Sequence, residues 1–477
     1  MTEEKSKSRN LIEGMLIYAI GNFGSKILVF LIVPLYTYYI STEDMGNYDL
    51  VLSTVNLLTP IVTMQISDAA FRWMIRNDGE NDIYIRSTIQ VLVINSLFTS
   101  CIIFVLNSIY PILYCGFLVG VLITSRALAT IQKLLRGLKN QKLFAVSGIS
   151  YTVVFLLLNI IKICCLHQGV ESLFQSAIIS NVFTLAIIFF FEKRLRIKYW
   201  FKPNVSIIKK LLKFSIPLVP NQLNWWIVNS SDRYIIRIFL NASANGIYSI
   251  SYKFPTMLQV ILSLFTTSWQ DVAVSDKDKD AGSFYTDVFK QLYLLSFGLL
   301  WVLNPLTKIF IWVFMNSNYH SAAEYVSFLY LGTVFQSFAS FYGVGYLRDK
   351  KTKQASLTSI YGAIVNVIVN IGLINFIGLQ AASVSTFLGF FVMWLIREKQ
   401  NRNELKVVID KRHFLALFIP TLILSFAECF TNLYMDIALS FLGIILFLAV
   451  NKETIIFLSN KFSLKWGKKV SDDEHRE

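Results

Sequence analysis

Long apolar runs recur along the whole chain, and they constrain its fold more than any other feature. A helix of about 20 mostly apolar residues is long enough to cross the hydrocarbon core of a bilayer. Of the 477 residues, 55% are hydrophobic and 16% are charged, whereas a soluble domain carries about 25% charged residues. Because backbone polar groups in lipid must be satisfied within the segment, these runs predict helices. We therefore expect an all-α polytopic membrane protein.

The apolar runs predict about fourteen transmembrane helices, in groups of six, six and two. The first group is expected at 12–39, 47–69, 87–108, 112–135, 143–165 and 172–191. The second group is expected at 214–240, 247–269, 290–313, 324–346, 355–376 and 381–396, and two more helices at 414–430 and 434–450. The domains are then an N-terminal six-helix bundle at 1–191, a basic linker at 192–213, a C-terminal six-helix bundle at 214–400, two additional helices at 401–460 and a tail at 461–477.

Two long segments, 200 residues apart, show the same order of sequence features. An apolar run ending near Ile40 is followed by Gly46 and Tyr48, and the stretch that begins at Phe214 leads to Gly246 and Tyr248 at the same offset. An internal repeat of half the chain is typical of membrane transporters. The recurring pattern therefore predicts two helix bundles that are parallel structural repeats of each other.

The distribution of lysine and arginine predicts the orientation. The even-numbered gaps between spans are rich in these residues, whereas the gaps 241–246, 314–323 and 377–380 contain none. Loops rich in lysine and arginine stay in the cytoplasm, so we expect both termini and the 192–213 linker there. The linker should include an amphipathic surface helix, with its basic residues beside anionic lipid. The outer gaps are too short to hold a catalytic domain.

Two cations are expected deep in the first bundle. Lys26 lies near the middle of the first span, one helical turn after Asn22, and Arg126 lies near the middle of the fourth. A cation at that depth costs about 3 kcal/mol or more, so something must offset it. The pattern indicates either an anion-binding cavity or a structural ion pair. Asp68 is the nearest acid in this half, and it can instead pair with Arg72.

The seventh span carries ionisable groups in its outer half. Asp232, Arg233 and Arg237 lie there, and Lys253 in the next span has a similar depth. They predict an outward gate of ion pairs. The alternative is that Arg237 and Lys253 reach the outer interface with their long side chains while Asp232 pairs with one of them.

Other polar residues within the spans predict contacts with a substrate or between helices. Asn221 and Trp225 share a stripe of the seventh span and are candidates for substrate binding. Asn366 and Asn370 are spaced i, i+4, so they either line the cavity or bond between helices. Glu428 is a candidate for a proton-linked carboxylate or for a groove that holds a lipid tail.

Two lysines near the outer ends of spans, Lys162 and Lys308, are interpreted as snorkelling to the interface.

Enzyme, metal and nucleic-acid functions find no support in the sequence. The chain has four histidines, no HExxH motif, no paired carboxylates with a base and no phosphate-binding glycine loop. We expect no catalytic residues, no metal site and no cofactor. The net charge of +14 is concentrated between apolar runs, which argues against nucleic acid as a partner.

Several motifs, in this order along residues 10–400, carry a resemblance to a known family. They are Gly21-Asn22-Phe23-Gly24-Ser25-Lys26, Ser41 to Asp49, Arg136-Gly137-Leu138, Pro217 and Pro220 with Asn221, Asp232-Arg233-Tyr234-Ile235, Gly246-Ile247-Tyr248, Tyr252-Lys253, Asn366 to Asn370 and Gly378 to Ala382. The chain resembles the Wzx-like polysaccharide flippases of the multidrug/oligosaccharidyl-lipid/polysaccharide exporter superfamily, which is abbreviated MOP. The last two spans contribute less to this resemblance.

The resemblance implies two six-helix bundles that face a central cavity and work by alternating access in the bacterial cytoplasmic membrane. The implied substrate is a capsule, O-antigen or other repeat unit linked to polyprenyl diphosphate, with polymerase and chain-length proteins as possible partners. A cationic cavity suits a diphosphate, in agreement with Lys26 and Arg126.

Two other functions stay open. One is a cation-coupled multidrug exporter of the same superfamily, which would hold a membrane-buried carboxylate. The other is a glycan polymerase or ligase, which would carry a large outer loop with arginines.

Overall fold

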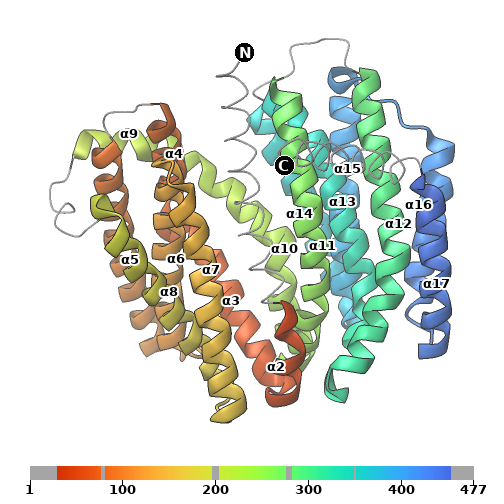
Figure 1. Ribbon diagram of the computed structural model, residues 1–477, viewed down its shortest axis with the longest axis horizontal. Coiled ribbons are helices and arrows are strands. Elements are labelled where there is room, and N and C mark those ends of the chain that lie inside the picture. The colour runs from red at the N-terminus through yellow and green to blue at the C-terminus, as the bar shows by residue number, and fades with distance from the viewer. Residues whose placement is uncertain (1–29, 77–80, 196–203, 276–281, 349–350, 453–477) are drawn as a thin grey trace, which may run out of the picture. The chain divides into compact units, whose positions relative to one another are not determined.

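The computed structural model describes residues 30–76, 81–195, 204–275, 282–348 and 351–452 (Figure 1). Within these ranges the chain forms helices and no strand, so the predicted all-α membrane fold is confirmed. Eight of the described helices are long and apolar enough to cross a membrane, or nine if one bent pair is a single span.

The chain divides into two compact units, Met1–Lys253 and Phe254–Glu477. The boundary lies inside α11, which runs over Ala242–Ser275. The division into six-helix bundles at 1–191 and 214–400 remains a prediction.

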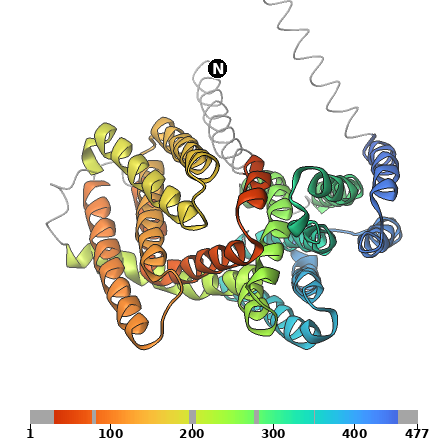
Figure 2. The same ribbon diagram turned by 90° about the horizontal axis from the view of Figure 1, so that it is seen from below.

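The first unit contains the helices up to the start of α11. They are α2 (Val33–Tyr39), α3 (Thr42–Thr63), α4 (Ile66–Arg76), α5 (Asn81–Ile109), α6 (Cys115–Gly137), α7 (Gln141–Asn159) with a π-helical turn at Ile160–Cys165, α8 (Glu171–Phe191), short 3-10 turns at Lys193–Leu195 and Ile216–Leu218, α9 (Val205–Ser215) and α10 (Val219–Phe239). Helix α5 lies beside α6, which in turn lies beside α7 and α8 (Figures 1 and 2).

The second predicted span is bent rather than straight. Residues 47–69 fall on α3 and α4, which meet at an angle of 56°. Met64 and Gln65 have φ values of 44° and 52°, in the left-handed region that interrupts a right-handed helix. The hydropathy of the run gave no sign of this break.

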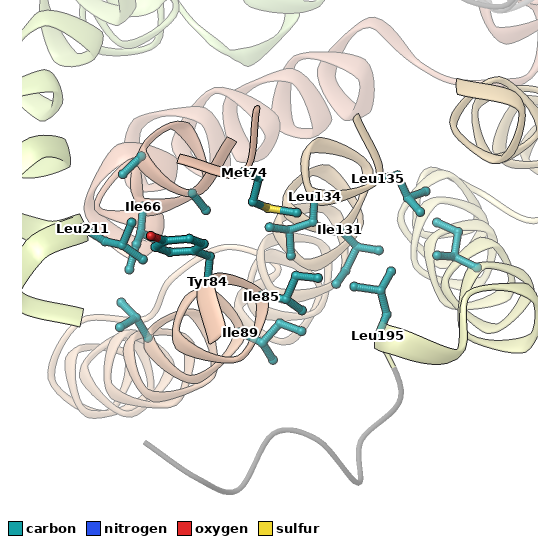
Figure 3. Packing of buried hydrophobic residues seen from close by; sticks show 14 of the residues in the cluster. Ile66, Met74, Tyr84, Ile85, Ile89, Ile131, Leu134, Leu135, Leu195 and Leu211 are labelled. Atoms are coloured by element: carbon teal, nitrogen blue, oxygen red, sulfur yellow. The ribbon is translucent and has the colours of Figure 1, made fainter. Parts of the chain in front are cut away.

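The basic linker contributes an amphipathic helix, α9. Its buried Leu211 joins a cluster that includes Ile66, Tyr84 and Leu134 (Figure 3). Lys209, by contrast, is exposed. Helix α9 is thereby held against α4 and α5 by its apolar face. Its three lysines are exposed, and Lys210 lies 5.4 Å from the centroid of the Trp73 ring.

The second unit consists of the rest of α11 and the helices that follow. They are α12 (Gly282–Phe314), a 3-10 turn (Ser317–Tyr319), α13 (Ala322–Arg348), α14 (Thr352–Ile377), α15 (Gln380–Leu405), α16 (Lys411–Ala427) and α17 (Leu433–Val450). Helix α13 packs along α15, α14 along α15, and α12 along α17.

Aromatic rings fill the core of the second unit. Phe335 on α13 is fully buried, and its ring centroid lies 5.0 Å from that of Phe391 and 5.3 Å from that of Trp394 on α15. It also lies 5.4 Å from the ring of Phe418 on α16. Edge-to-face and tilted pairs at such distances are favourable beyond their buried area. The rings therefore fix α13, α15 and α16 together.

Helix α15 extends well beyond the predicted end at residue 396. Arg397, which lies just after this predicted end and therefore in a predicted cytoplasmic gap, is 4% exposed and lies within the helix. Its guanidinium donates to the carbonyl of Ala339 at 2.9 Å and to the hydroxyls of Thr358 and Ser359 at 3.0 Å. The arginine therefore joins α13 and α14 to α15, and its charge is solvated by the protein itself.

The repeated glycines meet in the first unit. A Cβ atom on Gly46 would lie 1.8 Å from the carbonyl oxygen of Ala242, and one on Gly246 would lie 1.8 Å from that of Thr42. The amide of Asn245 donates to the carbonyl of Gly46 at 2.8 Å. The start of α3 and the start of α11 thus touch backbone to backbone, in a nearly symmetric way. The recurring motif marks this crossing.

We predict that Gly46→Ala and Gly246→Ala each destabilise the protein by roughly 3 kcal/mol or more, because overpacking at a backbone contact cannot be relieved by a side-chain rotation. The measurement is thermal unfolding of the purified protein in detergent. Gly148→Ala in α7 is the matched control, since a Cβ there meets nothing within 4 Å. If the Gly46 and Gly148 variants unfolded at the same temperature, the crossing would not be a tight contact.

Candidate functional site

A buried ion-pair network joins α3 and α10. The Arg233 guanidinium donates from Nη1 to Oδ1 of Asp232 at 2.8 Å and from Nε to Oδ2 of Asp49 at 3.2 Å. The side chains of Arg233, Asp232 and Asp49 are 8%, 1% and 14% exposed. Nη1 also donates to the carbonyl of Asn229 at 2.6 Å. Burial strengthens such pairs and makes the loss of one partner costly.

Tyrosines from α11 complete this network. The hydroxyl of Tyr248 donates to Oδ2 of Asp232, and the Arg233 guanidinium carbon lies 4.4 Å from the ring centroid of Tyr252. Lys253 is half-buried, and Asp49 is its neighbour of opposite charge. The group therefore brings together two carboxylates and two cations.

Among the predicted gate residues, the structure brings Asp232, Arg233 and Lys253 together. Arg237 is exposed on α10. A gating role for these residues remains a prediction.

A groove in the first unit is lined by aromatic rings and amides. It has a volume of about 260 Å³ and is formed by Asn56, Thr59, Pro60, Gln65, Gln222, Trp225, Trp226 and Ser230. The indole nitrogen of Trp226 donates to the carbonyl of Ser53 at 2.9 Å, and its ring packs edge-on against Tyr234 at 5.7 Å. Trp226 is thereby held in place beside Trp225. Of the two predicted residues on this stripe, Trp225 lines the groove, and Asn221 lies one turn before it on α10.

Arg126 lies half-buried on α6 with little compensation for its charge. Its Nε donates to the hydroxyl of Ser125 at 3.2 Å. Within the described residues no carboxylate forms an ion pair with Arg126. Tyr151 on α7 is its electrostatic neighbour and also that of Tyr36 on α2. The buried hydroxyl of Tyr36 has no hydrogen-bond partner in the described part of the chain.

Two further predicted residues of the first bundle, Asn22 and Lys26, lie outside the described residues. Asp68 on α4, the acid expected near Arg72, instead forms an ion pair with Lys133 on α6. Arg72 lies over the ring of Phe214, 4.5 Å from its centroid. Asp68 therefore does not compensate Arg126.

The two asparagines of α14 are fully buried. The amide of Asn366 lies 3.4 Å from the hydroxyl of Thr386 and 3.5 Å from that of Ser385, both on α15. Neither polar atom of the Asn370 side chain has a hydrogen-bond partner in the residues that the structure describes. The geometry of Asn366 favours bonding between helices, and substrate binding by either residue remains a prediction.

Several residues of these sites were not predicted from the sequence. Asp49 was noted only as part of a motif, although a carboxylate inside an apolar run is itself a signal of function or of a buried partner. Gln65, Asn56 and Gln222 approach the tryptophans only because α3 bends and packs against α10. No spacing rule along the chain brings those residues together.

The described residues include no group of three or more histidine, cysteine or acidic side chains placed to bind a metal ion.

Solved structures with the same fold are transporters. The chain matches "Lipid II flippase MurJ, inward closed conformation" with a TM-score of 0.68 and 15% identity, over 93% of this chain and 99% of that one. It matches an inward-facing multidrug resistance MATE family transporter of the MOP superfamily with a TM-score of 0.60 and 13% identity, over 84% and 96% of the two chains. A MOP superfamily transporter from Pyrococcus furiosus gives a TM-score of 0.53 and 16% identity, over 82% and 94%.

These likenesses establish the fold, which this chain shares with proteins described as a lipid II flippase and a multidrug resistance transporter. No curated protein matches the sequence. A family model described as "Polysaccharide biosynthesis protein" matches residues 11–269, which is more than half of the chain. The resemblance to polysaccharide flippases is thereby confirmed, and the chain belongs to the polysaccharide biosynthesis protein family.

Proposed function

We propose that this protein flips an oligosaccharide linked to polyprenyl diphosphate across the bacterial cytoplasmic membrane by alternating access. The family is one of polysaccharide biosynthesis, and the fold is shared with a protein described as a lipid II flippase. The substrate is a repeat unit of a capsule, an O-antigen or another surface polysaccharide. Both termini lie in the cytoplasm, and polymerase and chain-length proteins receive the product.

The observation that carries this proposal is the uncompensated charge of Arg126. By contrast, the buried Arg233 is neutralised by two carboxylates, and the buried Arg397 is solvated by several protein oxygens. Arg126 donates to one hydroxyl, and the unpartnered hydroxyl of Tyr36 shares its neighbour Tyr151. A guanidinium with phenol donors suits the oxygens of a diphosphate. Lys26 supplies a second cation to the same group.

The groove lined by Trp225 and Trp226 binds the sugar part of the substrate. The C–H faces of sugars pack on aromatic rings, and their hydroxyls exchange hydrogen bonds with amides such as those of Gln65 and Gln222. Such contacts tolerate differences between glycans, because they read shape and hydroxyl groups rather than charge. The diphosphate, which all such carriers share, binds at Arg126.

We predict that Arg126→Gln lowers export in a complementation assay at least roughly tenfold while membrane expression stays unchanged, since a charged hydrogen bond is worth about 1.5–3 kcal/mol. Lys26→Ala should have the same effect. Arg126→Lys should be milder, because it keeps the charge but not the planar fork.

The control for this experiment is Lys142→Gln, which removes an exposed cation at the start of α7. Normal export by an Arg126→Ala, Lys26→Ala double variant would contradict the diphosphate site. Loss of the Arg126 variants from the membrane would instead indicate a structural ion pair.

A second prediction concerns the groove. Trp225→Ala should weaken binding of the glycan-bearing carrier roughly fivefold, since an aromatic contact contributes about 1 kcal/mol. Trp225→Phe should retain most of the binding, and the bare polyprenyl diphosphate should bind equally to all three proteins. The measurement is the quenching of intrinsic fluorescence by carrier lipids with and without the glycan. Equal loss for both lipids would show that the tryptophan does not contact sugar.

A further inference from the structure

A second buried charge cluster lies at one end of α12, where it meets the connection between α16 and α17. Lys308 on α12 is 6% exposed, Glu428 in the connection is 2% exposed, and Asp436 in the first turn of α17 is fully buried. The sequence predicted that Lys308 would snorkel to the interface, and this prediction is wrong. The lysine instead points into the protein.

All three protons of the Lys308 ammonium are donated to other groups. Nζ lies 2.8 Å from the carbonyl oxygen of Glu428, 2.7 Å from the carbonyl oxygen of Thr431 and 2.7 Å from the hydroxyl of Thr431. A lysine has three donors, so none remains for a carboxylate. The distance from Nζ to Oδ2 of Asp436 is 3.6 Å, which gives charge compensation without a hydrogen bond.

Both carboxylates are therefore short of donors. Neither oxygen of Asp436 has a hydrogen-bond partner within the described residues, and neither does Oε1 of Glu428. Oε2 of Glu428 has the Thr431 hydroxyl at 3.4 Å. Asp436 is a charged neighbour of Glu428, and the Lys308 ammonium contacts both residues. An ionised carboxylate only accepts hydrogen bonds, so two ionised carboxylates cannot satisfy each other.

We propose that Glu428 and Asp436 form a proton-binding site that holds one shared proton at neutral pH. With both groups ionised, two buried negative charges would face one cation, and like charges at close range disfavour joint ionisation. One proton taken from water converts the pair to a carboxyl group that donates to a carboxylate. The remaining single charge then balances Lys308. This site does not depend on the proposed substrate.

The other titratable groups around the pair are few. The thiol of Cys429 lies 3.7 Å from the carbonyl oxygen of Glu324 on α13 and 3.7 Å from the amide of Gln380 on α15. Glu324 itself is exposed. Its carboxylate is the charged group that α13 contributes near Cys429. These neighbours bring no further cation to the pair.

The test is infrared spectroscopy of the purified protein across a pH series, which detects the C=O stretch of protonated carboxyl groups. Wild-type protein should show one more protonated carboxyl at neutral pH than Glu428→Gln or Asp436→Asn. That signal should disappear as the pH is raised. Glu324→Gln removes a nearby exposed carboxylate and should retain the signal.

Removal of the Lys308 charge should have the opposite effect to the amide variants, because it favours the protonated carboxyl group. In Lys308→Met the same signal should persist to higher pH, provided that the variant elutes as a folded protein. If Lys308→Met does not fold, the isosteric variants Glu428→Gln and Asp436→Asn alone test the proposal. Identical spectra of wild type and both amide variants would overturn the proposal. Thermal stabilisation of the wild type by sodium, lost in both variants, with no protonated carboxyl would overturn it as well.

Discussion

The crossing of α3 and α11 at Gly46 and Gly246 is the contact on which the first unit depends. Only residues without a Cβ allow the two helix starts to touch, and Asn245 then bonds the carbonyl of Gly46. Close approach at this point brings α3 along α10, so that Asp49, three residues after Gly46, reaches Arg233. The same packing seats Trp226 against Ser53 and shapes the groove. A small steric requirement thus positions both a charge network and a polar groove.

The buried cations differ in how far the protein itself neutralises or solvates their charge. This difference distinguishes structural cations from a cation that can bind a ligand. Arg233 has two carboxylates, Arg397 has carbonyls and hydroxyls on two neighbouring helices, and Lys308 has three oxygens. Each of these cations holds helices together. Most of its hydrogen-bond donors are already used within the protein, so few or none remain for a large ligand. Arg126 differs, because a single hydroxyl does not offset the cost of a half-buried guanidinium. An anionic ligand is the natural partner for such a group.

Much of the fold was predictable from hydropathy, because the length of an apolar run is fixed by the bilayer. Each predicted span after the first overlaps a described helix. The break at Met64 and Gln65 was not predictable, since it lies in backbone angles rather than in hydropathy. The extension of α15 past Arg397 was missed for a similar reason. A charged residue usually ends a span, but here two neighbouring helices, α13 and α14, supply oxygens that allow the arginine to be buried.

The candidate sites were less predictable than the fold. Trp225 and Arg126 could be selected from their depth in a span, but their partners come from other helices, as Gln65 and Tyr151 do. The snorkelling interpretation of Lys308 failed because the connection between α16 and α17 folds over it and offers two carbonyls. Such tertiary arrangements determine whether a cation faces lipid, protein or ligand. Sequence spacing along one helix cannot report them.

Movement of a diphosphate-linked glycan through the membrane is the function we propose. The most direct measurement uses the purified protein in vesicles that carry polyprenyl-diphosphate-linked oligosaccharide, with an impermeant glycosidase added outside. Flipping should make the glycan in the inner leaflet accessible to the enzyme, for glycans of different composition on the same carrier. Protected glycans, together with export of a cationic drug from the same vesicles under an ion gradient, would contradict the account.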